Sequence, residues 1–258
     1  MSEKFPDPEE NERPDPEEEV WVATIDEFVG AIRALLENHQ ESEVQALYRN
    51  WVAAQERKRD ALNAEGDRRV VAEFMVEREL DRAQIYAARK NIPYAYMTCV
   101  EAEYMAQQSN LGKLVLKCQE RQDAYYDENL DIDTRIECDR MRACFLAKNI
   151  ENGIKNAFDI LDAAVVKIRE ENRPDLIEGI KNTAARILRH EWRRLCWYVE
   201  SERGDETVQE FMGLAILARY IGRNDLAHSF MKDARRVSRG ETTLQANLDW
   251  APEKDTEG

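Results

Sequence analysis

Three arginines lie on one face of a long polar segment, and they are the first candidates for binding chemistry. Arg186, Arg189 and Arg193 follow one another at helical spacing, with Trp192 and Trp197 close by in the sequence. A guanidinium can hold a carboxylate or a phosphate through two parallel hydrogen bonds, and arginine and tryptophan are enriched at binding hot spots. The pattern predicts a partner-binding surface for an acidic or phosphorylated segment. The alternative is a solvated helix face whose arginines pair with neighbouring acids.

Patterns for catalysis or metal binding are scarce. The three histidines are His39, His190 and His228, and their spacing predicts no serine–histidine–aspartate or cysteine–histidine arrangement. No second histidine follows His190-Glu191 at the spacing of an H-E-x-x-H zinc site. The acids between Asp127 and Asp133 lack the glycine and the final glutamate of a calcium loop, which favours helix capping. We therefore expect no metal, no cofactor and an interaction protein rather than an enzyme.

One short string keeps an enzymatic alternative open. The segment from Arg223 to His228 reads Arg-Asn-Asp-Leu-Ala-His and resembles the R-x4-6-H motif of HEPN ribonucleases. That resemblance implies a catalytic pair, Arg223 and His228, acting on an RNA phosphate and its 2′-hydroxyl. A solvent-exposed histidine at a helix start is the structural alternative, and the acidic composition disfavours RNA binding.

The charge is concentrated at the two ends of the chain. The net charge is −15, of which residues 1–20 carry −7 from nine acids and two bases, and residues 241–258 carry −4 from five acids and one base. Both segments are poor in apolar residues, so we expect disordered acidic tails at 1–20 and 241–258 around a single helical domain at 21–240. For residues 1–20 the alternative is a docking segment that orders on binding. An acidic protein is a poor nonspecific ligand for nucleic acids.

The elements that would hold these residues are helices. Only 10 glycines and 7 prolines occur in 258 residues, which disfavours an all-β fold. Capping boxes at Thr24–Glu27 and Ser42–Gln45, and a capping Asp67, mark three helix starts. Gly66 ends the second helix, and Ile92 before Pro93 ends the third near Asn91. Further helices are expected near 94–108, 111–129, 132–149, 151–171, 175–202, 206–221 and 224–239, giving about ten in all.

Small residues recur within these helices at helical spacing. The three groups are Ala95–Cys99–Ala102, Ala157–Leu161–Ala164 and Ala227–Met231–Ala234. The last follows a helix carrying Phe211, Leu214, Ala215 and Ala218 and a break at Gly222. This unit resembles a tetratricopeptide (TPR) repeat, with Ala218 and Arg239 where that family prefers tyrosine and proline. The middle unit departs further, because Phe145 stands where a small residue is expected. The resemblance implies antiparallel hairpins in a TPR-like α-solenoid; an irregular helical bundle is the alternative.

A second resemblance lies near the start of the helical region. Residues 26–32 and the string Tyr48-Arg49-Asn50-Trp51-Val52 look like the first helices of the 14-3-3 family. That resemblance implies a phosphopeptide binder with Arg49 at a phosphate-contacting position. Glu56 departs from the pattern, since that family has an arginine near this place.

Location and redox state follow from what the sequence lacks. No run of about 18 apolar residues is present, so no membrane span is expected, and no secretory signal is visible. The five cysteines, Cys99, Cys118, Cys138, Cys144 and Cys196, sit within helical apolar patterns and predict buried, reduced thiols. We expect a cytoplasmic adaptor that binds another protein, not nucleic acid.

Overall fold

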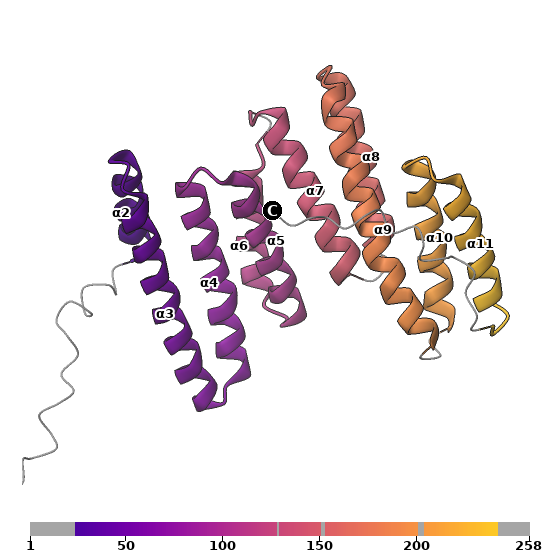
Figure 1. The fold of residues 1–258 in the computed structure, drawn as a ribbon. Helices are drawn as coiled ribbons and strands as arrows, with labels where there is room; N and C mark the ends of the chain where they lie inside the picture. Colours follow the sequence, from indigo (N-terminus) through magenta and orange to yellow (C-terminus); the bar gives the residue numbers. More distant parts are fainter. Residues whose placement is uncertain (1–23, 128, 151–152, 201–203, 242–258) are drawn as a thin grey trace, which may run out of the picture. The chain divides into compact units, whose positions relative to one another are not determined.

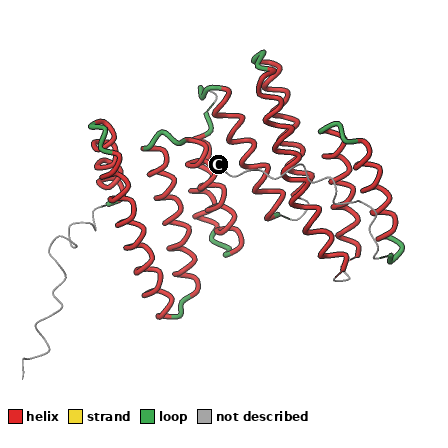
Figure 2. The backbone as a smooth tube through the Cα atoms, viewed as in Figure 1, coloured by secondary structure: helices red, strands yellow, loops and turns green. Residues whose placement is uncertain are grey.

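The predicted all-α fold is confirmed. The computed structural model describes residues 24–127, 129–150, 153–200 and 204–241, with the backbone alone for 196–200 and 204–206. These residues form ten α-helices and one 3-10 turn, with no strand among them (Figures 1 and 2). No helix in these ranges is both long and apolar enough to cross a membrane.

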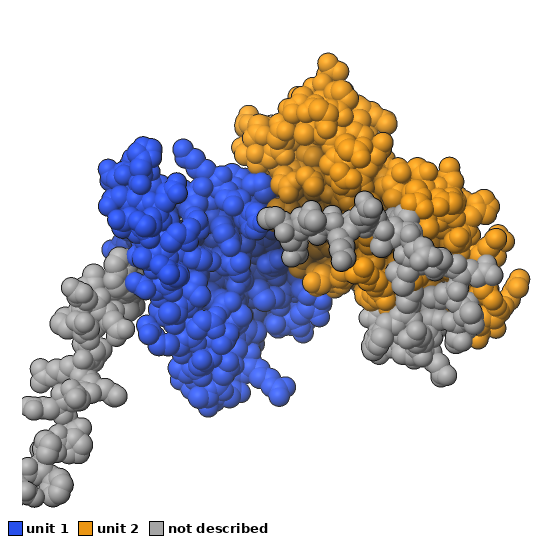
Figure 3. All heavy atoms as spheres, in the orientation of Figure 1, with its two compact units in different colours: residues 1–125 blue, residues 126–258 orange. Residues whose placement is uncertain are grey.

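The helices fall into two compact units, residues 1–125 and 126–258 (Figure 3). Unit 1 holds α2 (Ile25–Glu37), α3 (Glu41–Glu65), α4 (Arg68–Ala88), α5 (Ile92–Gln108) and α6 (Gly112–Tyr125). Unit 2 holds α7 (Ile132–Asn149), α8 (Gly153–Glu170), the 3-10 turn η1 (Pro174–Leu176), α9 (Ile177–Glu200), α10 (Gly204–Tyr220) and α11 (Asn224–Val237). The single domain expected at 21–240 stays a prediction. Whether the two units form one domain depends on whether they unfold together in one cooperative transition. The tails expected to be disordered lie outside the described residues, apart from Glu241.

Several helix starts follow the predicted capping chemistry. Thr24 and Glu27 form a reciprocal capping box at α2. The Asp67 carboxylate accepts the backbone N–H groups of Arg69 and Val70 at α4. Asp131 caps α7 in the same way, as the capping interpretation of the acidic segment predicted. These side chains satisfy N–H groups that have no partner inside the helix.

One predicted helix start is wrong, and so is the role predicted for Ile92. The Ser42–Gln45 box does not form, because α3 already begins at Glu41 and the Ser42 hydroxyl donates to Glu43. Helix α4 ends at Ala88, close to the predicted Asn91, but Ile92 is not the cause, because it is the first residue of α5, with Pro93 next to it in the first turn. Proline is tolerated there because the first N–H groups of a helix have no intrahelical acceptor.

Five connections between consecutive elements use one kind of turn. In each, a residue with positive φ follows the helix, and the next residue donates its N–H to the carbonyl five positions back, which is a Schellman cap. The positive-φ residues are His39, Lys90, Asn110, Asn172 and Gly222. Asparagine and glycine reach this conformation at low cost, which explains why the sequence marks the last three breaks clearly and the break at Lys90 poorly.

The three groups of small residues lie inside closely packed hairpins. Their helices α5, α8 and α11 pack most extensively on α4, α7 and α10, and every member is fully buried except Met231, which is partly buried. In the middle hairpin, Ala143 and Ala147 are buried while Phe145 is only half-buried. The contact face of α7 therefore does use small residues, shifted by two positions from the place that the sequence analysis tested.

The cysteines mostly behave as predicted. Cys99, Cys118 and Cys138 are buried free thiols, and burial raises the pKa of Cys99 and Cys138 to about 12 and that of Cys118 to about 11. Cys144 is the exception, because it is partly exposed. The side chain of Cys196 lies outside the described residues.

One carboxylate in unit 1 makes stability depend on pH. Burial raises the pKa of Asp81 to about 6, and the nearby Lys117 offsets only part of this rise. The folded chain therefore holds a proton that the unfolded chain releases above pH ~4. Because the folded state binds more protons, the free energy of unfolding falls as the pH rises through this window.

We expect Asp81→Asn to stabilise the protein at pH 7.5, since asparagine resembles the protonated acid. The gain should be about 1 kcal/mol, after allowance for the solvent that still reaches this side chain. Urea unfolding at pH 7.5 and at pH 4 measures it. The gain should shrink toward zero at the lower pH, and an equal gain at both pH values would contradict the assignment to Asp81.

Candidate functional site

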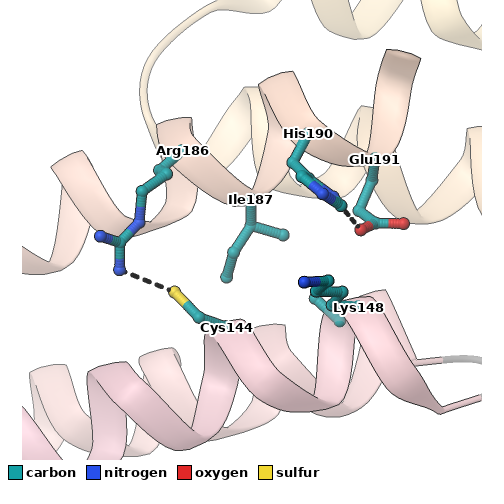
Figure 4. A pocket seen from close by; sticks show the side chains of 7 residues that line it. Cys144, Lys148, Arg186, Ile187, His190 and Glu191 are labelled. Atoms are coloured by element: carbon teal, nitrogen blue, oxygen red, sulfur yellow. Dashed lines mark hydrogen bonds and ion pairs between the residues drawn. The ribbon is translucent and has the colours of Figure 1, made fainter. Parts of the chain in front are cut away.

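A cavity of about 170 Å³ lies between α7 and α9 in unit 2. Helix α7 contributes Cys144, Ala147 and Lys148, and helix α9 contributes Arg186, Ile187, His190 and Glu191. Within each helix these positions are spaced by about one turn, so each set forms one helix face. The cavity is therefore the space between two facing helix surfaces (Figure 4).

The cavity has an apolar floor and a cationic rim. Ala147 and Ile187 are buried members of the unit 2 core, while Lys148, Arg186 and His190 are exposed. The Arg186 Nη2 donates to the Cys144 Sγ at 3.0 Å. Thiol sulfur is a weak hydrogen-bond acceptor, so an oxygen anion would be a stronger partner for this guanidinium.

Glu191 is the acidic residue that lines the cavity, and its two carboxylate oxygens contact two different side chains. It is 1% exposed; its Oε1 lies 2.8 Å from the His190 Nδ1, and its Oε2 lies 2.7 Å from the Arg194 Nε. Arg194 also reaches Glu210 of α10 at 3.5 Å. A buried carboxylate needs such compensation, so Glu191 holds His190 in place, and Arg194 links α9 to α10.

The arrangement favours binding over nucleophilic catalysis. Cys144 and His190 line one cavity, but Cys144 bonds to Arg186 and His190 bonds to Glu191. Figure 4 shows Ile187 between these two pairs. A cysteine nucleophile needs its base within hydrogen-bond reach. In the described part of the chain, no group of three or more histidine, cysteine or acidic residues could hold a metal ion.

The three arginines predicted to share one binding surface have different surroundings in the structure. Arg186 lines the cavity, whereas Arg189 is half-buried and Arg193 is exposed, and neither lines it. Trp192 is buried in the unit 2 core, contrary to the expectation that it borders the binding surface, because its position on α9 faces the other helices. The side chain of Trp197 lies outside the described residues.

Sequence reasoning missed the α7 half of the site. Cys144 and Lys148 come from a helix about 40 residues before Arg186, and no local pattern links the two segments. The i, i+4 spacing of Cys144 and Lys148 gives only a weak signal, since that spacing is common on any helix face. The sequence suggests His190 and Glu191 only as half of an incomplete zinc motif, whereas in the structure the exposed imidazole is hydrogen-bonded to the buried carboxylate.

The geometry at the HEPN-like string gives its arginine a structural role. Arg223 precedes α11, and its guanidinium donates two hydrogen bonds, of 3.0 and 2.7 Å, to the Asp225 carboxylate. This contact lowers the pKa of Asp225 to about 2. His228 is exposed one turn further along. The guanidinium that would act on an RNA phosphate is thus held by a carboxylate two residues away.

At the 14-3-3-like string, the structure gives partners to the residue that departs from the family pattern. Arg49 is exposed on α3, and Glu56 pairs with Arg59 at 2.5 Å and with Arg78 at 2.9 Å. Near the place where that family has an arginine, this chain therefore has a carboxylate that is paired with two arginines of its own.

No protein-family model, curated protein or solved structure is detectably similar to this chain. Its function has to be argued from the geometry of its own sites.

Proposed function

We propose that this protein is a helical interaction module that binds an acidic or phosphorylated segment of a partner protein in the α7–α9 cavity. The observation that carries the proposal is the pair of cationic groups, Lys148 and Arg186, beside the His190 imidazole and around an apolar floor. The buried acid of the lining is already compensated within the protein. An incoming anion therefore meets net positive charge.

The proposed ligand combines an anion with a neighbouring apolar residue. Ala147 and Ile187 offer an apolar surface to a small side chain, while Arg186 and Lys148 offer N–H donors to oxygen anions. Sites of this kind take their orientation from a few polar groups and their affinity from apolar burial.

The wider proposal is an adaptor built from TPR-like hairpins and acting in the cytoplasm. The α10–α11 hairpin supports it, because Phe211, Leu214 and Ala227 are buried at its contact and Gly222 makes the turn. The free thiols of the described cysteines fit a reducing compartment.

The test compares cavity variants with a matched charge variant on the same helix. The probe is a fluorescent heptapeptide with a central phosphoserine next to leucine, together with its glutamate and serine forms. We expect Lys148→Ala and Arg186→Ala each to weaken binding of the anionic forms about tenfold, the loss of one charge-assisted contact. Arg193→Ala removes the same charge from the exposed surface outside the cavity and should leave affinity nearly unchanged.

The results distinguish binding in the α7–α9 cavity from nonspecific attraction between charges. Equal losses for Arg186→Ala and Arg193→Ala would show that only net charge matters. Equal affinity for the serine and phosphoserine peptides would also contradict the proposal. Binding should weaken as salt rises, because surface charges are screened.

A further inference from the structure

A second cavity, of about 350 Å³, lies between α3 and α4 in unit 1. Its α3 wall carries Tyr48, Trp51 and Glu56, and its α4 wall carries Arg78 and Arg82. The Glu56 carboxylate is paired with Arg59 and Arg78, so its charge is compensated within the protein. These two helices run side by side in Figure 1. The site is separate from the α7–α9 cavity and has different chemistry, because aromatic rings face guanidinium groups.

The aromatic wall is packed against neighbouring side chains. The Tyr48 and Trp51 rings are stacked, with centroids 6.0 Å apart, and Trp51 also packs against Phe28 of α2 at 6.1 Å. The Arg89 guanidinium lies over the Tyr48 ring, 6.0 Å from its centroid. Tyr48 and Trp51 remain half-exposed, so part of this surface is open to a ligand.

The arginines of the other wall are held by internal partners. Buried Glu79 binds both Arg78 and Arg82 at 3.0 Å, and the Arg82 Nε and Nη2 donate to the Tyr86 hydroxyl at 3.3 and 3.1 Å. Arg82 is 37% exposed, and a guanidinium has more N–H groups than these contacts use. Preorganised guanidinium groups of this kind favour carboxylate ligands.

Aromatic surfaces of this type bind proline rings, and arginines bind carboxylates. The chain carries a segment with both groups in alternation. Pro-Asp-Pro-Glu-Glu occurs twice, at residues 6–10 and again at residues 14–18. The second copy precedes the first residue of α2 by only six residues, 19–24.

The point where this segment joins the fold lies beside the cavity. Phe28, one turn into α2, touches Trp51 of the aromatic wall. Six residues span up to ~20 Å when extended, so the second copy can reach the cavity from the start of α2. A short tether of this kind gives an effective concentration on the order of millimolar, at which weak contacts suffice.

We propose that residues 14–18 of the chain bind in the α3–α4 cavity of the same molecule. The prolines lie against Trp51 and Tyr48, and the acids lie beside Arg82 and Arg89. The segment acts as a built-in ligand that competes with acidic, proline-containing segments of other proteins for this site.

Hydrogen exchange on the full chain gives the direct test. The backbone amides of residues 15 and 17–19 should exchange more slowly than those of residues 7, 9 and 10, since Pro16 and Pro8 have no amide hydrogen. Salt at 0.5 M should remove much of this protection. Arg82→Gln should remove it as well. Arg89→Gln is a second variant that leaves the Glu79 contacts intact and should act in the same direction. Unprotected exchange of residues 15–19 in the wild type would overturn the proposal, as would protection that grows with protein concentration.

Competition gives an independent test. The probe is a labelled peptide with the sequence of residues 13–20, added to full-length variants. Neutralising the second copy through Asp15→Asn, Glu17→Gln and Glu18→Gln should raise probe affinity about tenfold by freeing the cavity. The same changes in the first copy, at Asp7, Glu9 and Glu10, alter net charge equally and should have little effect.

A final control addresses charge on α3. Arg57 is exposed on this helix but does not line the cavity. In the variant with the neutralised second copy, Arg82→Gln should abolish the gained affinity, whereas Arg57→Gln should keep most of it. Equal effects of the two substitutions, or equal effects of the two tail variants, would refute the assignment.

Discussion

Replacing Lys167 with methionine is expected to lower the free energy of unfolding by about 2–3 kcal/mol, among the largest single-residue effects in unit 2. The Lys167 Nζ donates to Asp139 at 2.8 Å and to the Tyr126 hydroxyl at 2.6 Å. Burial acts to lower the pKa of Lys167, but these hydrogen bonds outweigh it and the net pKa is raised. Methionine would leave the Asp139 carboxylate, only 9% exposed, without its countercharge.

The expected loss in the free energy of unfolding depends on the Asp139 carboxylate, which stays buried after Lys167 is replaced. The Tyr126 hydroxyl still donates to Asp139 at 3.1 Å, yet a neutral donor compensates a charge less well than an ammonium group does. Breaking a fully buried ion pair costs about 3–5 kcal/mol. The lower figure expected here reflects the 34% exposure of the Lys167 side chain, through which water can reach the site.

A double-mutant cycle in urea unfolding separates charge from packing. Asp139→Asn in the Lys167→Met background should recover part of the lost stability, since the uncompensated charge is gone. Lys155→Met on the exposed face of α8 is the matched control and should change stability little. If the double variant is no more stable than Lys167→Met alone, lost packing explains the effect and the ionic argument is wrong.

Gly153→Ala is expected to destabilise the α7–α8 hairpin by about 3 kcal/mol, at the upper end of overpacking effects. An alanine Cβ would overlap the Leu146 carbonyl oxygen, and it would approach the Leu146 carbonyl carbon at 2.7 Å and the Ala147 Cα at 3.0 Å. All three are backbone atoms, so no rotamer change relieves the clash. The start of α8 would have to move away from α7.

Gly30→Ala is the matched control for this prediction. Gly30 lies inside α2, and apart from its chain neighbours and the surrounding helix backbone no atom stands within 4 Å of the position that its Cβ would take. Alanine there should stabilise the helix by about 0.5–1 kcal/mol, because glycine loses more backbone entropy on folding. Thermal unfolding of both variants should give shifts of opposite sign. A neutral Gly153→Ala would show that the hairpin has room to adjust.

The sequence alone determined most of the local structure. Thr24, Asp67 and Gly66 act at short range on the backbone beside them, so their side chains or their freedom at positive φ mark helix ends without tertiary information. The alanine spacing of α5, α8 and α11 likewise indicated the close contacts of the hairpins. Ile92-Pro93 misled, because the same dipeptide fits a helix end and a helix start.

The tertiary structure decided which residues could form a site. The α9 pattern placed Arg186, Arg193 and Trp192 near one another, but only the packing of α9 on α7 put Arg186 at a cavity and buried Trp192 in the core. Lys148 joins Arg186 across about 40 residues of sequence. Helix formation depends on interactions within a few residues, whereas a cavity depends on which faces of distant helices meet, and that is fixed by the packing of the whole unit.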